Sequence, residues 1–296
     1  MRFSFFRGCF IPVRLPYIEK VSRFVLGELG VELRDIDGFT CCPEPVGFQI
    51  HDRFTATVIA ARNISLAEDA GEDIITLCNG CTYVLRQVNE GLKADEELRD
   101  RVNDVLSSTD HQFRGTVDVK HFAHVLKEDV GVKRIKEKVE KPLLGLTVAG
   151  HTGCHIVSPV DVMGFDDPFD PVVLDEMVAA LGAEPADFDL KTLCCGWTLT
   201  NYGDRESANK LVGAKLSAMR GAGSDCITAI CPQCFYQFDT GQMLASRRLG
   251  LDFKLPVMFY LQLLALSMGY SLDDIHYRMH RVRDPGFEDK IGRLLS

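Results

Sequence analysis

The sequence predicts an α/β fold that is built twice, with parallel strands alternating with helices in each half of the chain. Three observations support this prediction: cysteine spacing repeats between the halves, short apolar runs alternate with stretches of helical periodicity, and a charged segment separates the two halves. Strands that alternate with helices are typical of parallel α/β units. We place the boundary near Pro142, so that one domain covers residues 1–141 and a second covers 142–296.

The first half is expected to begin with a short strand over residues 2–6, which ends at the loop that contains Cys9. Residues 15–29 carry apolar side chains at helical spacing, and residues 54–66 are also predicted to be helical. A short β-rich run over 73–77 then leads into Cys-Asn-Gly-Cys, which we expect to open a helix.

The second half repeats this order. A strand over 146–149 leads to Cys154, and helices are predicted over 172–181 and 206–219. A strand over 227–230 then leads into Cys-Pro-Gln-Cys. The same kinds of element therefore precede the cysteines in both halves.

The segment between the halves, about residues 92–141, is rich in charge and includes EELRDRVNDVL and KRIKEKVEK. We interpret these stretches as helices that face solvent. Such a charge run predicts a solvated surface and not a binding patch.

The longest apolar segment covers residues 255–270 and reads LPVMFYLQLLALSMGY. It is too short and too interrupted for a membrane span, which needs about 20 residues. The pattern predicts a buried or half-buried helix. The alternative interpretation is a docking face for another protein of a complex.

Composition and charge exclude several classes of function. Hydrophobic residues make up 46% and charged residues 25% of the 296 residues, as in an ordinary globular protein. A net charge of −9 argues against general binding to nucleic acid or anionic lipid. Arg7 and Arg14 interrupt the N-terminal apolar residues, so we predict no signal peptide and a cytoplasmic location. Clustered thiols in that reducing compartment indicate metal or redox chemistry.

Ten of the eleven cysteines form two matching sets. In the first set, 31 residues separate Cys9 from Cys41-Cys42, and 35 residues separate that pair from the CxxC motif. In the second set, the intervals are 39 and 35 residues. The flanks agree as well: GCFIP matches GCHIV, FTCCPEP matches TLCCGWT, and DIITLCNGCTY matches CITAICPQCFY. The ten residues are Cys9, Cys41, Cys42, Cys78, Cys81, Cys154, Cys194, Cys195, Cys231 and Cys234.

Placement of each CxxC motif where a strand ends and a helix begins favours metal binding. Backbone N–H groups and the positive helix end point to this place and stabilise thiolates. It is also the sheet edge where open α/β folds bind ligands. A CxxC pair can hold one metal centre, whereas two adjacent cysteines suit two irons of one cluster.

Two other metal or redox sites compete with this interpretation. Structural zinc takes four ligands, and each set here has five cysteines. Regular four-iron clusters also use four cysteines, so five per set indicate an unusual cluster. A dithiol–disulfide relay at the CxxC pairs is a further alternative, which the wide separation of the repeated sets disfavours.

The pattern C-x31–39-CC-x35–36-C-x-x-C resembles the cysteine-rich CCG domain. Two such domains in one chain of 296 residues, without a ferredoxin module, are similar to the heterodisulfide reductase B-subunit family of methanogenic archaea. The resemblance implies Rossmann-like parallel βαβ units, each carrying an iron–sulfur cluster. It also implies two noncubane [4Fe-4S] clusters, one held by each five-cysteine set. One departure is Pro43 where the second set has Gly196, which changes the local backbone because proline fixes φ.

The resemblance further implies an activity and partners. The activity would be reduction of CoM-S-S-CoB, the mixed disulfide of coenzyme M and coenzyme B, to two thiols with one electron from each cluster. The partners would be the ferredoxin-like and flavin-containing subunits of the same reductase, with hydrogenase or formate dehydrogenase upstream. The alternative is a CCG electron-transfer subunit of another oxidoreductase, of the lactate, glycerol-3-phosphate or fumarate type. Those often carry fused ferredoxin motifs, and no C-x2-C-x2-C-x3-C run occurs here.

Four residues near or outside the cysteine sets have less certain chemistry. His151 and His155 flank Cys154 and are the catalytic candidates, since each could protonate a product thiolate or hydrogen-bond a cluster sulfur. The alternative for each is a structural role as the cap of a loop. Trp197 could form a wall of the substrate cavity, although core packing is the simpler expectation. Cys226 is expected to be a small buried apolar residue.

The substrate of the resembled family carries sulfonate, carboxylate and phosphate groups, so an acidic protein must place arginine or lysine in its cavity. Arg7 and Arg14 bracket Cys9, and Lys191 precedes Cys194. These three are the candidates. His51 and Arg53, which follow the first Cys-Cys pair, are weaker ones.

Overall fold

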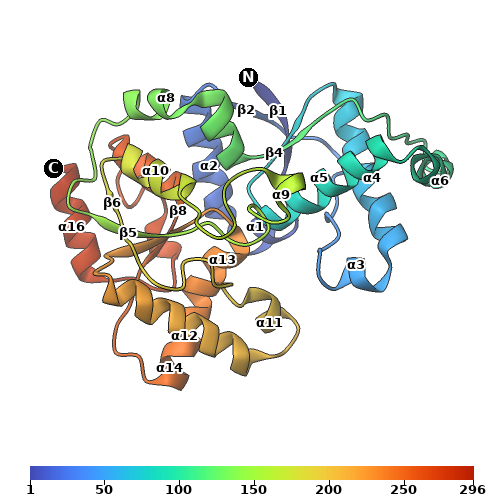
Figure 1. The fold of residues 1–296 in the computed structure, drawn as a ribbon. Helices are drawn as coiled ribbons and strands as arrows, with labels where there is room; N and C mark the ends of the chain where they lie inside the picture. Colours follow the sequence, from blue (N-terminus) through green and yellow to red (C-terminus); the bar gives the residue numbers. More distant parts are fainter.

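Eight short strands form two parallel sheets, one in each half of the chain, in a computed structural model that describes residues 1–296 (Figure 1). The first sheet has the order β2-β1-β3-β4, and the second has the order β6-β5-β7-β8. The predicted α/β fold with two repeated units is therefore confirmed. The strands are β1 (Arg2–Phe6), β2 (Glu32–Arg34), β3 (Ile74–Thr76), β4 (Val119–His121), β5 (Thr147–His151), β6 (Glu184–Pro185), β7 (Cys226–Ala229) and β8 (Val257–Phe259).

Both sheets change winding direction at the same place. β1 pairs with β2 on one side and with β3 on the other, and β5 pairs with β6 and β7 in the same way. The connection that follows β1 therefore runs to one edge of the sheet, and the connection that follows β3 runs to the other edge. The carboxyl ends of the strands at such a switch point border the crevice where open α/β folds bind ligands.

Helices of the first half start and stop where the sequence has capping residues. Asp52 accepts a hydrogen bond from the backbone N–H of Thr55 at 3.0 Å, and Gly71, with φ of 66°, ends the same helix. Asp95 caps the next exposed helix in the same way. The helices are α1 (Phe10–Arg14), α2 (Pro16–Glu28), α3 (Phe48–His51), α4 (Arg53–Ala70), α5 (Asn79–Ala94), α6 (Glu96–Ser107), α7 (Phe122–His124), the π-helical η1 (Val125–Val130) and α8 (Val132–Glu137).

The second half carries helices in corresponding places. Pro232 to Leu249 is one unbroken helical stretch with a π-helical turn in its middle. The helices are α9 (Val160–Met163), α10 (Val173–Ala180), α11 (Trp197–Asn201), α12 (Arg205–Gly221), α13 (Pro232–Tyr236), the π-helical η2 (Gln237–Gly241), α14 (Gln242–Leu249), α15 (Tyr260–Ser267), the 3₁₀-helical η3 (Tyr277–Met279) and α16 (Pro285–Leu295).

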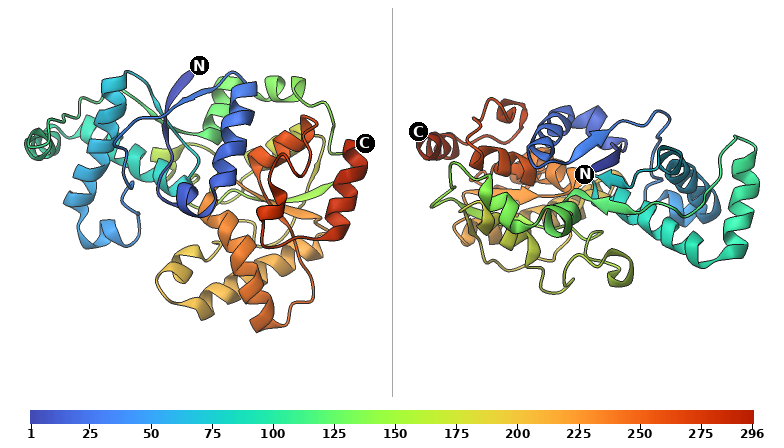
Figure 2. Two further views of the ribbon diagram at one scale, coloured as in Figure 1. Left: turned by 180° about the vertical axis from the view of Figure 1, so that it is seen from behind. Right: turned by 90° about the horizontal axis from the view of Figure 1, so that it is seen from above.

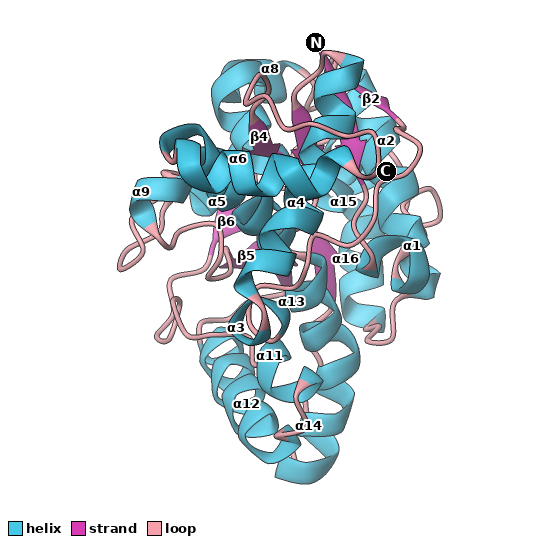
Figure 3. Cartoon of the chain, turned by 90° about the vertical axis from the view of Figure 1, so that its right-hand side faces the viewer, coloured by secondary structure: helices cyan, strands magenta, loops and turns pink.

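One continuous apolar core joins the two halves. Helix α2 of the first half packs against α15 of the second, as the view from behind in Figure 2 shows. Figure 3 shows helices enclosing the strands, with α12 and α14 side by side at one end of the molecule. None of the helices combines the length and the apolar character that crossing a bilayer requires.

Two sequence-based expectations need correction. The charged segment contains not only helices but also β4, whose Val119 and His121 are buried at the edge of the first sheet. Residues 255–270 form strand β8 followed by helix α15, instead of one helix. Both elements are buried throughout, so they offer no exposed face to another protein.

Burial of α15 can be tested by truncating one of its core side chains. Leu264 is fully buried, and we expect Leu264→Ala to lower the free energy of unfolding by about 2–5 kcal/mol, because it leaves a cavity. Leu244→Ala is the matched control, since Leu244 is 46% exposed and its truncation should change stability by less than about 0.5 kcal/mol. Urea denaturation measures both. Equal losses would contradict the observed burial.

Candidate functional site

The ten predicted cysteines lie between the two halves as one continuous chain of neighbouring thiols, each close enough to shift the pKa of the next. The order in the first set is Cys9, Cys41, Cys42, Cys81, Cys78, and the order in the second set is Cys154, Cys194, Cys195, Cys234, Cys231. A contact between Cys78 and Cys231 joins the two sets. The structure therefore brings together all ten of these residues.

The internal repeat makes the two halves of the thiol chain equivalent to each other. Cys78 and Cys231 occupy the same position in the two CxxC motifs, and they meet at the centre of the chain. Exposure follows the same symmetry: Cys9, Cys41 and Cys154 are exposed near the two ends, while the six central thiols are buried. Any molecule that reaches the sulfurs from solvent thus meets the ends of the chain first.

Local structure explains why these thiols converge. Cys78 and Cys231 have extended backbones and precede the first residues of α5 and α13, so both stand at helix N-termini directly after β3 and β7. The loops with Cys9 and Cys154 follow the adjacent strands β1 and β5. Both pairs of strands flank a switch point, which is why a regular fold collects the thiols at one edge of each sheet.

Hydrogen bonding within the chain stabilises particular thiolates. The pKa of Cys42 is lowered to about 5, first because of a hydrogen bond with Cys41 and then because of one with Cys81. The pKa of Cys194 is lowered to about 2 by hydrogen bonds with Cys154 and Cys195. The pKa of Cys231 is also lowered, whereas those of the other seven thiols are raised, so three of the ten favour the thiolate form that binds metal.

Two glycines allow the strand-end loops to approach the sulfurs. Gly8 has φ of 67°, and a Cβ there would stand 3.0 Å from Sγ of Cys81. Gly153 has φ of 81°, and a Cβ there would stand 2.7 Å from Nδ2 of Asn79 and 3.5 Å from Sγ of Cys234. A side chain at position 8 would crowd the thiol of Cys81, and one at position 153 would clash with Asn79 beside the first CxxC motif.

The donor set fits a multi-metal centre better than a single ion. Each half gathers five thiols, whereas tetrahedral zinc takes four ligands. All eleven cysteines are free, so no disulfide competes for the ten thiols. The residues present therefore suit an iron–sulfur cluster at each set.

Residues of each half also hold the loops of the other. Nδ2 of Asn79 donates to the carbonyl of Thr152 at 2.8 Å, which ties the first CxxC motif to the loop before Cys154. The hydroxyl of Tyr202 donates to Glu44 at 2.6 Å. These contacts fix how far apart the two cysteine sets can be.

The two exposed ends of the thiol chain have different surroundings. Beside Cys9, the rings of Phe10, Trp197 and Tyr236 pack edge to face, with centroids 5.1–5.6 Å apart. At the equivalent place beside Cys154, the ring of His155 stacks on Tyr83, with centroids 5.3 Å apart. One end is therefore lined by aromatic rings, and the other has an imidazole.

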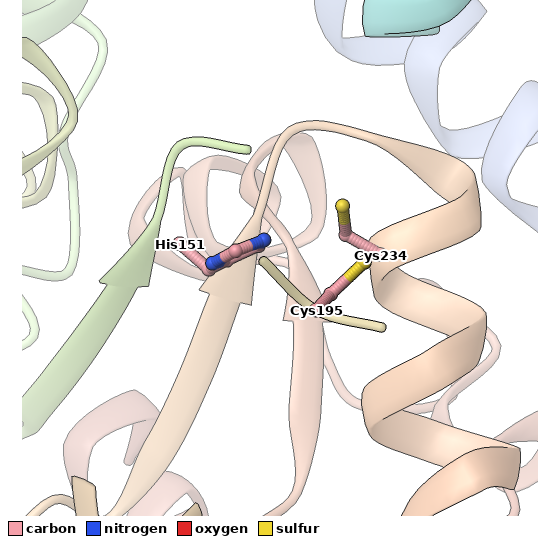
Figure 4. A group of neighbouring side chains, drawn as sticks. All are labelled: His151, Cys195 and Cys234. Atoms are coloured by element: carbon pink, nitrogen blue, oxygen red, sulfur yellow. The ribbon is translucent and has the colours of Figure 1, made fainter. Parts of the chain in front are cut away.

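The two histidine candidates occupy different environments. His155 is half-buried, and its Nδ1 lies 3.9 Å from Sγ of Cys154. His151 is buried at the end of β5, and Figure 4 shows its ring pointing toward Cys195 and Cys234, with the nearest ligand atoms of the three residues within 4.8 Å. Neither ring nitrogen of His151 has a hydrogen-bond partner, and burial keeps its pKa well below the usual range.

The five basic candidates separate into two groups. Arg7 lines a small cavity that contains all five thiols of the first set together with Pro232 and Gln233 of the second CxxC motif. Arg14 lines a larger groove next to the aromatic cluster, with Tyr236 in its wall. The other three candidates line neither space. His51 and Arg53 are exposed at the end of α3 and the start of α4, and the ammonium of Lys191 is paired with Asp175.

Several residues of the site escaped sequence reasoning. Arg247 and Arg281 line the same groove as Arg14, although they are distant from it in sequence. Lys215 is fully buried, and its Nζ donates to the carbonyls of Lys191 and Leu193 at 2.8 and 2.6 Å. The sequence does give one indication of Lys215: it is a charged residue on the face of α12 that is otherwise made of buried apolar and small residues.

The remaining two expectations concern packing residues. Cys226 is buried in β7 and takes no part in the thiol chain, in agreement with its expected role as a small apolar residue. Trp197 is half-buried within the aromatic cluster, which agrees with core packing, and it lines neither of the two spaces described above.

The close approach at Gly153 makes a testable prediction. Gly153→Ala should lower the free energy of unfolding by more than about 1–2 kcal/mol, the cost of backbone strain alone, because the new methyl group also meets Asn79. Gly250→Ala is the matched control, since Gly250 has φ of 67° with nothing within 4 Å of the added Cβ. Urea unfolding compares the two, and equal losses would show that the loop at Gly153 does not pack tightly against Asn79.

Comparisons with known proteins agree with this geometry. The cysteine-rich domain family CCG matches residues 3–86 and 148–239. A solved structure of a hypothetical protein from Helicobacter pylori shares the fold, with a TM-score of 0.75 and 14% identity, covering 96% of this chain and 52% of that one.

Curated relatives match nearly the whole chain. The B-subunit of the ferredoxin/F420H2-dependent CoB-CoM heterodisulfide reductase of Methanosarcina acetivorans is 37% identical over 98% of this chain and 97% of the relative. The B-subunit of the ferredoxin:CoB-CoM heterodisulfide reductase of Methanosarcina mazei is 36% identical over 98% and 97%. The 8-methylmenaquinol:fumarate reductase membrane anchor subunit of Wolinella succinogenes is 30% identical over 92% and 94%. Two complete cysteine sets, two CCG domains and these full-length matches place the chain in the heterodisulfide reductase B-subunit family.

Proposed function

We propose that this chain is the catalytic subunit of a CoB–CoM heterodisulfide reductase and reduces CoM-S-S-CoB to two thiols. The observation that carries the proposal is the unbroken chain of ten thiols, symmetric about the contact between Cys78 and Cys231 and exposed near both ends. The names of the full-length relatives in two Methanosarcina species support the choice of substrate.

Each five-cysteine set would hold one noncubane [4Fe-4S] cluster, and these clusters supply electrons one at a time when bound. Cys78 and Cys231 bring the two sets into contact. That contact suits a disulfide substrate, because breaking an S–S bond takes two electrons. The first set consists of Cys9, Cys41, Cys42, Cys78 and Cys81, and the second consists of Cys154, Cys194, Cys195, Cys231 and Cys234.

Protonation of the products would fall to His155. Reduction of a disulfide to two thiols consumes two protons, and His155 stands next to the exposed Cys154 with its ring held against Tyr83. His151 is buried, so it is poorly placed to exchange protons with solvent. Its two unpartnered nitrogens fit the other role considered for it, a hydrogen bond to a cluster sulfur.

Binding of the anionic substrate would use the groove next to the aromatic cluster. Arg14, Arg247 and Arg281 line it, while the chain as a whole carries a net charge of −9. Guanidinium groups bind sulfonate, carboxylate and phosphate through paired hydrogen bonds, so a local group of arginines can attract the substrate to an acidic protein.

The partners follow from the same proposal. The relatives are named as one subunit of a multi-subunit reductase, so the chain would work in a complex with a ferredoxin-like subunit that delivers electrons from a flavin-containing one. Hydrogenase or formate dehydrogenase would supply the electrons, in the cytoplasm. We also propose that the two domains divide at Pro142, which lies in the connection between α8 and β5.

A CCG electron-transfer subunit of the fumarate type is the second candidate, since the Wolinella succinogenes relative is also matched over most of its length. Anaerobically purified complex should reduce CoM-S-S-CoB, and it should not couple menaquinol oxidation to fumarate reduction. The opposite pattern would favour the second candidate. A colourless protein that contains zinc and no iron would exclude both.

Single cysteine variants test the cluster sites. We expect Cys81→Ala and Cys234→Ala each to abolish disulfide reduction while the fold survives, because each removes a buried ligand from one set. Cys226→Ala is the matched control: it also removes a buried thiol but lies outside the thiol chain, so iron content and turnover should stay at the wild-type level. Full activity in either ligand variant would refute the proposed sites.

Substitution of Arg14 tests the substrate groove. Arg14→Gln removes one positive charge and should raise KM for CoM-S-S-CoB about tenfold or more, with little change in kcat, because it weakens binding of a charged group by about 1.5–3 kcal/mol. Arg248→Gln is the control, since Arg248 is an exposed neighbour of Arg247 that does not line the groove. An unchanged KM in the Arg14 variant would place the substrate elsewhere.

A further inference from the structure

A buried charge breaks the symmetry between the two cysteine sets. Helices α4 and α12 are repeat equivalents, and each is followed by a glycine of positive φ, Gly71 and Gly223. The residue eight positions before the glycine is Asn63 in the first helix and Lys215 in the second. Both side chains are completely buried.

Asn63 and Lys215 perform the same structural task. Asn63 accepts the N–H of Thr40 at 2.9 Å and donates to the carbonyl of Cys41 at 3.0 Å. Lys215 donates to the carbonyl of Leu193, the residue before Cys194, at 2.6 Å. Each therefore fixes the loop that carries the adjacent cysteine pair, but only Lys215 does so with a charge.

The charge of Lys215 is not neutralised by a carboxylate. Its ammonium donates to two backbone carbonyls, and burial lowers its pKa to about 8, so it remains protonated at neutral pH. The groups that raise its pKa against this burial are those of the second cysteine set, with Cys234 and Cys195 first. At such a buried site, water screens the interaction far less than at the surface.

His151 adds to the same difference. It stands three residues before the first cysteine of its set, where the other half has the apolar Phe6. Its ring nitrogens lack partners beside Cys195 and Cys234, and Lys215 is the charged group that most affects its pKa, after burial. The second set thus has a buried cation and an unpartnered buried histidine, whereas the arginine in the cavity of the first set, Arg7, has a side chain that is 49% exposed.

We propose that Lys215 is a positioning residue that gives the centre at the second cysteine set a higher reduction potential than the centre at the first. Reduction adds a negative charge to a thiolate-ligated centre, and a nearby buried cation stabilises that charge. Net charge and hydrogen bonds to sulfur are among the factors that set such potentials. Electrons reaching this chain therefore collect first at the second set. The inference rests on the proposed function, because it requires a cluster at each set.

The test is a spectroscopically monitored redox titration of the intact chain with its clusters, without substrate. Wild-type protein should give two reduction waves. Lys215→Met keeps the length of the side chain but removes its charge, and it should lower the equilibrium constant for the higher-potential wave at least tenfold, or about 59 mV for one electron. The lower-potential wave should keep its potential. In Lys215→Arg, the higher-potential wave should lie close to its wild-type potential.

Lys210→Met is the matched control. Lys210 lies on the same helix, but it is exposed and paired with Glu206, so loss of its charge should move neither wave. An unchanged potential in Lys215→Met, or a shift confined to the lower wave, would overturn the proposal. If Lys215→Met prevents a cluster from assembling at the second set, the proposal requires that the higher-potential wave disappears. Loss of the lower-potential wave instead would also refute the proposal.

Failure of the proposed function gives a different result. A chain without iron, or with iron for only one cluster, would contradict a cluster at each set. One wave in a wild-type protein that holds iron for two clusters would reject only the proposed difference in potential. Two waves that ignore Lys215 would leave the clusters in place and reject only the role of this lysine.

Discussion

Contact between the two CxxC motifs is the constraint on which the rest of the structure depends. Cys78 and Cys231 can meet only if the carboxyl ends of β3 and β7 face each other across the interface between the halves. The hydrogen bond from Asn79 to Thr152 and the shared core around α2 and α15 hold that geometry. Two domains on a flexible linker would not keep ten thiols in one continuous chain, because a site of this kind must be held to within about 0.5 Å.

The internal repeat explains most of the site, and departures from the repeat are where its chemistry becomes specific. Equivalent loops, helix starts and glycines place equivalent sulfurs, so each half builds the same five-thiol cradle. Phe10 and His155 then distinguish the exposed ends of the chain, and Asn63 and Lys215 distinguish its buried sides. Directed transfer of electrons and protons requires such differences, because two identical five-thiol sites would favour neither direction.

Much of this arrangement could be predicted from the sequence, since cysteine spacing and the order of strands and helices are local patterns. The strands before each cysteine loop and the helices α2, α4 and α12 agree with the predicted ranges. Strand β4 was missed because only three residues form it within a charged segment. The apolar pattern predicts a helix at β8 because a continuous apolar run looks the same in a buried strand and a buried helix. The sharing of one groove by residues that are distant in sequence, such as Arg14 and Arg247, depends on how the halves pack.

Lys215 illustrates why a buried polar residue carries more information than its local pattern suggests. Leaving an ammonium in a core is costly unless something specific offsets the loss of water, and here two carbonyl acceptors and the neighbouring second cysteine set do so. The neutral Asn63 holds the equivalent loop in the first half, so the loop itself does not require a charge. The cation at Lys215 is therefore better explained by the electrostatics of the second cysteine set than by the stability of the fold.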